Sequence, residues 1–331
     1  MTNRGSKARL QMGLVSLHSH GQPADRLLRR SRTEPSLPAG GPRGPAVGNA
    51  ARHSDSRDTL PVVARLDRMR EVVDRLHPSG LLYATYEHRL IAELDPNRLP
   101  RHVAVLADGN RRWARTNAPG QPLVAGYQAG ADKLKEFVGW CDEIGIPVVT
   151  LWVLSTDNLT RSHRQEVEPL LGVIEHMVSD LAATRRWRVH PVGALDLLPA
   201  QSAKRLKMAD RDTAEINGML VNIAVSYGGR YELRDAVRSL LAEHAKNGTS
   251  IDDLAHTLDI EHIAEHLYTK GQPDPDLIIR TSGEQRLSGF LMWQSAHSEF
   301  YFCEALWPDF RKVDFIRALR SYGQRERRFG R

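Results

Sequence analysis

Five runs of apolar, β-favouring residues in this chain lack polar alternation, and this feature restricts the fold more than any other. Strands of this kind need cover on both faces, and helix-like patterns separate them along the chain. The sequence therefore predicts an α/β domain with a parallel sheet. The expected strands are 102–107, 146–154, 187–193, 220–225 and 277–280, and the expected helices are 126–140, 164–182, 199–213, 230–246 and 260–268.

The predicted domain does not include the whole chain of 331 residues. Residues 1–60 are rich in Gly, Pro, Ser and Arg, and such a composition cannot bury enough apolar surface to offset its ordering entropy. We expect a disordered, basic extension there. Residues 61–79 carry apolar side chains at helical spacing and are expected to form an amphipathic helix and a linker. Residues 80–331 are expected to form the single α/β domain.

Charge and cysteine content restrict the compartment and the partners. The net charge of +6 lies in the extension, because residues 1–60 hold ten Lys and Arg against four Asp and Glu. The domain is neutral overall, which argues against a nucleic-acid-binding surface.

Cys141 and Cys303 are far apart, as in proteins of a reducing compartment. No apolar run approaches the roughly 20 residues of a membrane span. We expect a cytoplasmic protein. Peripheral contact of the basic extension with an anionic membrane is one interpretation, and an extension without such a role is favoured over it.

A turn with one carboxylate, one glycine and two arginines follows the first expected strand. It comprises residues 108–112 and reads Asp-Gly-Asn-Arg-Arg. Ligands of parallel α/β sheets bind outside the carboxyl ends of the strands, where helix N-termini attract anions. One carboxylate among several cations indicates a divalent metal that accompanies a phosphate. The competing interpretation is an ordinary turn in which Asp108 caps a helix and the arginines are solvated.

Three further polar turns follow expected strands, at 155–161, 226–230 and 280–289. All four turns would meet at one edge of the sheet, which turn chemistry alone explains poorly. Downstream of them, Glu299 lies in an apolar stretch. A buried carboxylate there needs a partner, which is either a metal ion or an arginine.

The turn at 280–289 is the most typical of a phosphate site. Arg280 and Arg286, together with Ser288, could form a pocket of paired donors for a diphosphate. The alternative is a surface ion-pair network in which Arg280 pairs with Glu284 or Asp276.

These motifs together resemble the cis-prenyltransferases, the undecaprenyl-diphosphate-synthase-like Z-isoprenyl diphosphate synthases. The resemblance rests on Asp-Gly-Asn-x-Arg-Trp-Ala from residue 108, Ser-Thr-Asp-Asn-Leu-x-Arg from 155, Tyr-Gly-Gly-Arg from 227, and the long Ile-Arg-Thr-Ser-Gly-Glu-Gln-Arg-Leu-Ser-Gly motif from 279. The motifs occur in order, from about residue 100 to the C-terminal Arg-Arg-Phe-Gly. Their details are most similar to the actinobacterial short-chain members.

The resemblance implies a single domain with a mostly parallel six-stranded sheet flanked by helices, and a homodimer. It also implies Mg²⁺-dependent condensation of isopentenyl diphosphate with a short allylic diphosphate, with a hydrophobic tunnel for the growing chain. This chemistry fits the residues, since Mg²⁺ and arginines stabilise a departing diphosphate and an apolar wall keeps water from the allylic cation.

The family's site residues are expected at the matching positions of this chain. Asp108 would position Mg²⁺, with Glu299 as a second metal contact. The residues expected near the reacting carbons are Asn110, Ser155 and Asn158. Those expected to bind the allylic diphosphate are Gly109, Arg111, Arg112 and Trp113, with Arg161 at the mouth of the site. Those expected to bind isopentenyl diphosphate are Arg280, Arg286 and Ser288, with Arg328 and Gly330 of the C-terminal tail reaching this site in the neighbouring subunit.

Product length should depend on how soon the tunnel is blocked. Val153 and Leu154 match positions that line the tunnel, and Val153 is bulkier than the alanine of long-chain enzymes. We therefore expect a short product, such as the C15 compound (2Z,6E)-farnesyl diphosphate. The sequence departs from the long-chain pattern at Tyr127, where those enzymes have a histidine, and near Leu123, where they have an arginine.

Three other functions are compatible with parts of the sequence. The first is a medium- or long-chain polyprenyl diphosphate synthase, which would differ in the tunnel residues. The second is a non-catalytic partner subunit, which is disfavoured because Asp108 and the strand-end arginines are retained. The third is a nucleic-acid-binding protein recruited by its basic extension, which the neutral domain disfavours.

Overall fold

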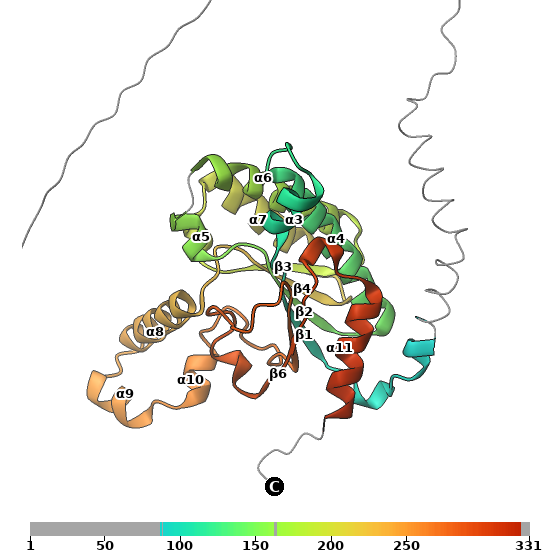
Figure 1. Ribbon diagram of the computed structural model, residues 1–331. Helices are drawn as coiled ribbons and strands as arrows, with labels where there is room; N and C mark the ends of the chain where they lie inside the picture. Colours follow the sequence, from blue (N-terminus) through green and yellow to red (C-terminus); the bar gives the residue numbers. More distant parts are fainter. Residues whose placement is uncertain (1–86, 88, 162–163, 326–331) are drawn as a thin grey trace, which may run out of the picture. The chain divides into compact units, whose positions relative to one another are not determined.

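Six parallel strands form the centre of the fold in the computed structural model of this chain (Figure 1). They are β1(His102–Leu106), β2(Val148–Trp152), β3(Arg188–Val192), β4(Leu220–Ala224), β5(Leu277–Arg280) and β6(Glu299–Phe302), in the spatial order β3-β4-β2-β1-β5-β6. The structure describes residue 87 and residues 89–161 and 164–325. The predicted extension 1–60 and the predicted segment 61–79 lie outside these residues.

The five expected strands are confirmed, and the structure refines the sheet in two respects. Every strand pair is parallel, whereas we expected a mostly parallel sheet. The sixth strand, β6, comes from the C-terminal aromatic run. The second strand is shorter than the expected 146–154, because Val153 and Leu154 leave the regular ladder and both direct their N–H groups to the Ala224 carbonyl.

Helices join the strands from β1 to β5, as is usual for parallel pairing, and a connection with the 3-10 helix Gln294–His297 joins β5 to β6. The α-helices are α3(Asn110–Asn117), α4(Val124–Ile144), α5(Thr156–Arg161), α6(Arg164–Ala183), α7(Ala200–Thr213), α8(Gly229–Lys246), α9(Ile251–Thr257), α10(Ile260–Ala264) and α11(Lys312–Gln324). In Figure 1, α4, α6 and α7 lie above the sheet and α8, α9 and α10 lie to its lower left.

Three of these helices, α5, α9 and α11, were not among those expected, whereas a helix directly after the Asp108 turn, here α3, was. Two of them carry local start signals in the sequence. The Ser250 side chain accepts a hydrogen bond from the Asp253 N–H and begins α9. Asp314 accepts from the Arg311 N–H and stabilises the first turn of α11. Both are short-range N-cap interactions.

The two faces of the sheet pack against different groups of side chains. Val103, Val105 and Leu151 contribute to the larger core with α4, α6, α7 and α11. Ala104 and Leu106 point to the other face and pack with Tyr227 and Phe290, among others. This alternation follows from the two-residue period of a strand. The polar turns that follow the strands are therefore held on a sheet buried on both faces.

The N-terminal end of the described chain packs on the last helix. Leu90 is buried against Val313 and Ile316 of α11.

Among the described helices, none combines the length and the apolar character that a bilayer crossing requires.

Candidate active site

The carboxyl ends of β1 and β5 lie side by side in the sheet. The order of the strands reverses at this point. From β1 the chain continues to β2 on one side of it, and β5 is later added on the other side. Open α/β sheets bind ligands at such a switch point. Asp108 follows β1 and Arg280 ends β5, so the fold brings two of the predicted site residues to this place.

The turn after β1 needs a glycine. Gly109 has φ = 112°, a conformation that other residues rarely adopt, and a Cβ there would lie 2.9 Å from Leu306 Cδ2. The turn allows α3 to begin immediately at Asn110. The Asn110 carboxamide donates to the Ala107 carbonyl, 3.3 Å away, and packs against α4, where a Cβ at Gly130 would lie 2.4 Å from Asn110 Oδ1.

Asp108 and Arg280 form an ion pair at the centre of this edge. Asp108 Oδ2 lies 3.0 Å from Arg280 Nη2. The Arg280 side chain is only 5% exposed, whereas that of Asp108 is 43% exposed. Arg280 also donates to the Ser288 hydroxyl, at 3.0 Å, and to the Arg286 carbonyl. The ion-pair alternatives for Arg280, with Glu284 or Asp276, are therefore not what the structure contains.

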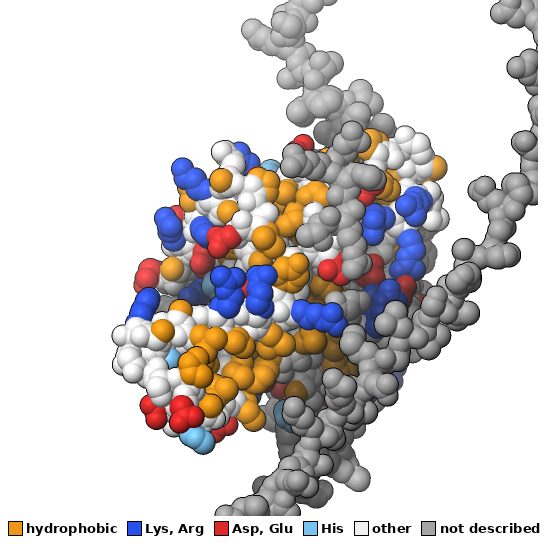
Figure 2. Space-filling view, turned by 90° about the vertical axis from the view of Figure 1, so that its left-hand side faces the viewer, with side chains coloured by type: hydrophobic (Ala, Val, Ile, Leu, Met, Phe, Trp, Pro, Cys, Tyr) orange, Lys and Arg blue, Asp and Glu red, His pale blue; other side chains and the backbone are white. Residues whose placement is uncertain are grey.

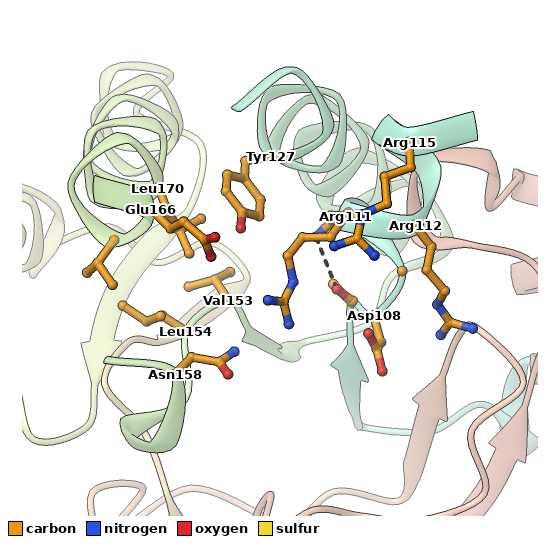
Figure 3. Close-up of a pocket in the computed structure, with 14 residues that line it drawn as sticks. Asp108, Arg111, Arg112, Arg115, Tyr127, Val153, Leu154, Asn158, Glu166 and Leu170 are labelled. Carbon is orange, nitrogen blue, oxygen red and sulfur yellow. Dashed lines mark hydrogen bonds between the residues drawn. The ribbon is translucent and has the colours of Figure 1, made fainter. Parts of the chain in front are cut away.

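A first cavity of about 360 Å³ opens beside Asp108 (Figure 3). Three arginines of α3 line one side of it, namely Arg111, Arg112 and Arg115. Apolar side chains of β2's end and α6 line the other side, namely Val153, Leu154, Val167 and Leu170. A molecule with an anionic end and an apolar chain matches this arrangement.

A second cavity, of about 710 Å³, lies on the other side of Asp108. It contains the predicted diphosphate residues Arg280, Arg286 and Ser288, together with Ser155. The two cavities share six lining residues, which are Ala107, Asp108, Arg111, Val153, Leu154 and Asn158. Ligands in the two cavities would therefore meet beside Asp108.

Two side chains opposite the arginines add polar character to the first cavity. Figure 3 shows the Tyr127 hydroxyl directed towards the Glu166 carboxylate. Partial burial raises the pKa of Tyr127, and the positive charge of Arg111 acts against this rise. Tyr127 therefore stays a neutral hydroxyl at physiological pH.

Some predicted site residues do not reach either cavity. Trp113 points away and donates its indole N–H to Asp309, at 2.8 Å. Glu299 is the first residue of β6, in register with Leu277, and it forms an ion pair with Arg325 of the C-terminal segment. It therefore lies about 16 Å along the sheet from Asp108, at the opposite edge, if each residue advances about 3.3 Å.

Three predicted positions cannot be placed in full. Arg161 ends α5, and its side chain lies outside the described residues, as do Arg328 and Gly330.

The cavities also contain residues that were not predicted to bind substrate. The first includes Arg115, Tyr127 and Glu166, and the second includes Trp152, Tyr227, Arg230, Tyr231 and Met292. A sequence signal existed for Tyr227 and Arg230, since both belong to the polar turn after β4. None existed for Glu166, because its position depends on how α6 packs over the sheet.

The residues beside Asp108 fit a metal that arrives with a phosphate rather than one held by the protein alone. Among the described residues, no three His, Cys, Asp or Glu side chains form a metal-binding group. Asp108 nevertheless presents a half-exposed carboxylate, with Arg280 on Oδ2, to both cavities. Mg²⁺ commonly takes one or two carboxylates and completes its coordination with water and phosphate oxygens.

Comparisons with known proteins show the family of this chain. Residues 106–330 match the family model described as "Putative undecaprenyl diphosphate synthase". The (2Z,6E)-farnesyl diphosphate synthase of Thermobifida fusca is 60% identical over 75% of this chain and 97% of its own. Isoprenyl transferase 1 of Streptomyces avermitilis is 57% identical over 76% of this chain and 96% of its own.

A solved structure shares the fold. Lavandulyl diphosphate synthase from Lavandula x intermedia, in complex with dimethylallyl diphosphate, superposes with a TM-score of 0.65 at 33% identity, over 71% of this chain and all of the other. On the family match and these identities, the chain belongs to the undecaprenyl diphosphate synthase family of cis-prenyltransferases and is a Z-isoprenyl diphosphate synthase.

Proposed function

We propose that this protein is a short-chain synthase that condenses isopentenyl diphosphate with an allylic diphosphate to give a C15 product, (2Z,6E)-farnesyl diphosphate. The observation that carries the proposal is the first cavity, which has arginines at one side and Val153, Leu154 and Leu170 at the other. The 60% identity to the Thermobifida fusca (2Z,6E)-farnesyl diphosphate synthase supports the same product.

In this proposal the allylic diphosphate occupies the first cavity. The arginines of α3 and the free N–H groups at its start bind the diphosphate, because both supply positive charge to an anion. The apolar residues receive the hydrocarbon chain and exclude water from the allylic carbon. Mg²⁺, held by Asp108, would neutralise the departing diphosphate.

Isopentenyl diphosphate occupies the second cavity. Arg280 and Arg286 bind its diphosphate, with Ser288 as a further donor, since guanidinium groups suit phosphate oxygens. Ser155 and Asn158 then lie between the two substrates, where the Ser155 hydroxyl accepts the Asn158 N–H at 3.0 Å. We place these two residues, with Asn110, beside the carbon that loses its proton.

A homodimer is also part of the proposal. Apolar side chains of α8, α9 and α10 are exposed, and Figure 2 shows apolar side chains gathered below a row of cationic ones on this face of the molecule. The exposed residues are Val237, Leu241, Ile251, Leu258 and Ile260. Exposed apolar groups of this kind favour association. In light scattering, the wild type should have the molar mass of a dimer and Leu241→Glu that of a monomer. A monomer mass for the wild type would refute the homodimer.

The test of the function is direct. Purified protein is incubated with radiolabelled isopentenyl diphosphate, Mg²⁺ and either dimethylallyl, geranyl or farnesyl diphosphate, and the products are resolved by chain length. We expect a C15 product from geranyl diphosphate. Products of C50 or longer would favour a long-chain carrier synthase, and no turnover with any starter would favour a non-catalytic partner subunit.

A further inference from the structure

An aromatic wall lines the second cavity, and the roles assigned above do not use it. Trp152, at the end of β2, is stacked on Phe290 with the ring planes 3° apart and the centroids 5.1 Å apart. Tyr227 packs edge-to-face against both rings, and its ring centroid lies 6.5 Å from that of Trp152 and 5.9 Å from that of Phe290. Phe290 covers one face of the indole, and Trp152 still lines the cavity. The uncovered part of the ring is therefore what a bound molecule meets.

The sheet register sets Trp152 at a defined distance from the diphosphate residues. Leu106 of β1 is paired with Trp152 on one side and with Arg280 on the other. Paired residues of neighbouring strands point to the same face, so both side chains project into the same cavity. Two strand spacings separate their Cα atoms by about 10 Å. A molecule whose diphosphate lies at Arg280 therefore has Trp152 within reach of its short hydrocarbon part.

The condensation produces positive charge in that hydrocarbon part. The π electrons between C3 and C4 of isopentenyl diphosphate form the new bond to C1 of the allylic substrate, while the C1–O bond breaks and its electron pair leaves with the diphosphate. Positive charge stays at C3 until a proton moves from C2 to an oxygen of the released diphosphate, which completes the new double bond. The arginines of the cavity repel such a charge, whereas the face of an indole attracts it.

We propose that the indole ring of Trp152 is a catalytic group that stabilises the positive charge at C3 of the isopentenyl unit. This inference rests on the assignment of the second cavity to isopentenyl diphosphate. It adds an electrostatic role to a side chain that otherwise appears only as part of the packing around Phe290.

The decisive experiment changes the electron density of the ring and leaves its shape nearly constant. Trp152 is replaced, at that codon alone, by mono-, di- and trifluorotryptophan, and the single-turnover rate is measured with saturating substrates. Each fluorine weakens the attraction of the ring for a cation, so the logarithm of the rate should fall in proportion to the cation-binding energy of the ring. The KM for isopentenyl diphosphate should change by less than about twofold, because the effect is confined to the transition state.

Conventional variants give the size of the effect. The indole N–H of Trp152 has no hydrogen-bond partner among the described residues, so Trp152→Phe breaks no hydrogen bond of the free protein. We expect a loss of a few-fold in turnover for Trp152→Phe and of roughly tenfold or more for Trp152→Leu. The matched control is fluorination of Trp187, which is buried in the larger core, lines neither cavity and likewise has an indole N–H without a partner among the described residues. The single-turnover rate of the control protein should not change on fluorination.

The outcomes separate this inference from the proposed function. Equal rates across the fluorinated Trp152 series in an active enzyme would overturn the role of Trp152 and leave the function intact. Absence of turnover in the wild type with every allylic starter would overturn the function itself. If Trp152→Leu does not fold, the fluorinated series still decides, because those rings occupy nearly the same volume as tryptophan.

Discussion

Asp108 Oδ2 and Arg280 Nη2 are 3.0 Å apart, although 172 residues separate the two positions in the chain. The residue after Arg280 adds a second connection, since the Thr281 hydroxyl donates to the Asp108 carbonyl at 2.8 Å and accepts from the Asp108 N–H at 3.0 Å. The carboxylate proposed to hold Mg²⁺ and the guanidinium proposed to hold isopentenyl diphosphate thus neutralise each other in the free protein. Ligands that bind either group must compete with this pair, so the two cavities are energetically coupled.

The first prediction concerns metal binding in the absence of substrate. Arg280 competes with a cation for Asp108, so the free protein should bind Mn²⁺, used as a probe for Mg²⁺, only weakly. Arg280→Met should tighten this binding by roughly ten- to a hundredfold, because a charge-assisted contact of roughly 1.5–3 kcal/mol is removed from the carboxylate. Titration followed by electron paramagnetic resonance measures it. The control is Arg311→Met, whose partner is Asp314. Equal Mn²⁺ affinities for wild type and Arg280→Met would contradict the competition.

The second prediction concerns turnover. Asp108→Ala should lower kcat by about 100-fold or more, since the stabilisation that a metal gives to a leaving group amounts to several kcal/mol. Asp108→Ala also leaves the buried Arg280 guanidinium without this carboxylate, so the melting temperature should fall by several degrees as well. Steady-state kinetics and thermal unfolding measure the two effects. Asp196→Ala, in which a 96% exposed side chain is removed, should leave both unchanged. An Asp108→Ala protein of full activity would refute the metal-positioning role.

The third prediction concerns product length. Val153 lines both cavities, and Val153→Ala enlarges the apolar side of the first one. Products longer than C15 should then appear in mass spectra of the reaction mixture. Val149→Ala is the matched control, because Val149 lies on the same strand and is fully buried but lines neither cavity. An identical product distribution for Val153→Ala and wild type would show that Val153 does not limit the chain.

The fourth prediction concerns acid stability and depends on His102. Burial lowers the pKa of His102 from its ordinary 6.5 to about 4. Its Nδ1 lies 2.7 Å from the Pro273 carbonyl, which can only accept, so Nδ1 donates and Nε2 accepts from the Thr150 hydroxyl, also at 2.7 Å. The neutral ring satisfies both contacts, whereas a proton on Nε2 would take away the acceptor of the Thr150 hydroxyl.

The sign of the effect follows from the lowered pKa. The unfolded chain binds a proton at this position near pH 6.5, whereas the folded protein resists protonation until about pH 4. Stability is therefore fully present above pH 6.5 and is lost as the pH falls towards 4, with a loss of about 2 kcal/mol at pH 5. Urea unfolding at pH 7 and pH 5 measures this loss. His102→Gln should be less stable at pH 7 and should lose less between the two pH values, while His176→Gln, at a 71% exposed position, should behave like wild type.

The strands and the polar edge of the sheet could be predicted because their signals are local. An unbroken apolar run such as Ile146–Leu154 predicts a buried strand, and the residues that follow it identify the edge. The partner of Arg280 could not be predicted in this way. The alternative to a phosphate site paired Arg280 with the carboxylates nearby in the sequence, Glu284 or Asp276, whereas pairing of β1 with β5 brings Asp108 to it instead.

The position of Glu299 shows the same limit. Its isolation in an apolar stretch indicated that it needs a partner, and an arginine was one of the two alternatives. The partner is Arg325 of the same chain, because the C-terminal end of α11 lies beside the start of β6. The sequence contains no signal for this return, which depends on the packing of α11. A role of Glu299 in metal binding stays a prediction, and within one chain it does not meet Asp108.

The shared border of the two cavities has a consequence for repeated addition. In the proposed arrangement, the chain elongated by one condensation carries the diphosphate of the isopentenyl unit, at Arg280 in the second cavity. A further round requires that diphosphate to be handed over past Asp108 and Arg111 to the arginines of α3. Release competes with this handover at every step. In such an enzyme, processivity depends on the speed of the transfer as well as on the depth of the tunnel.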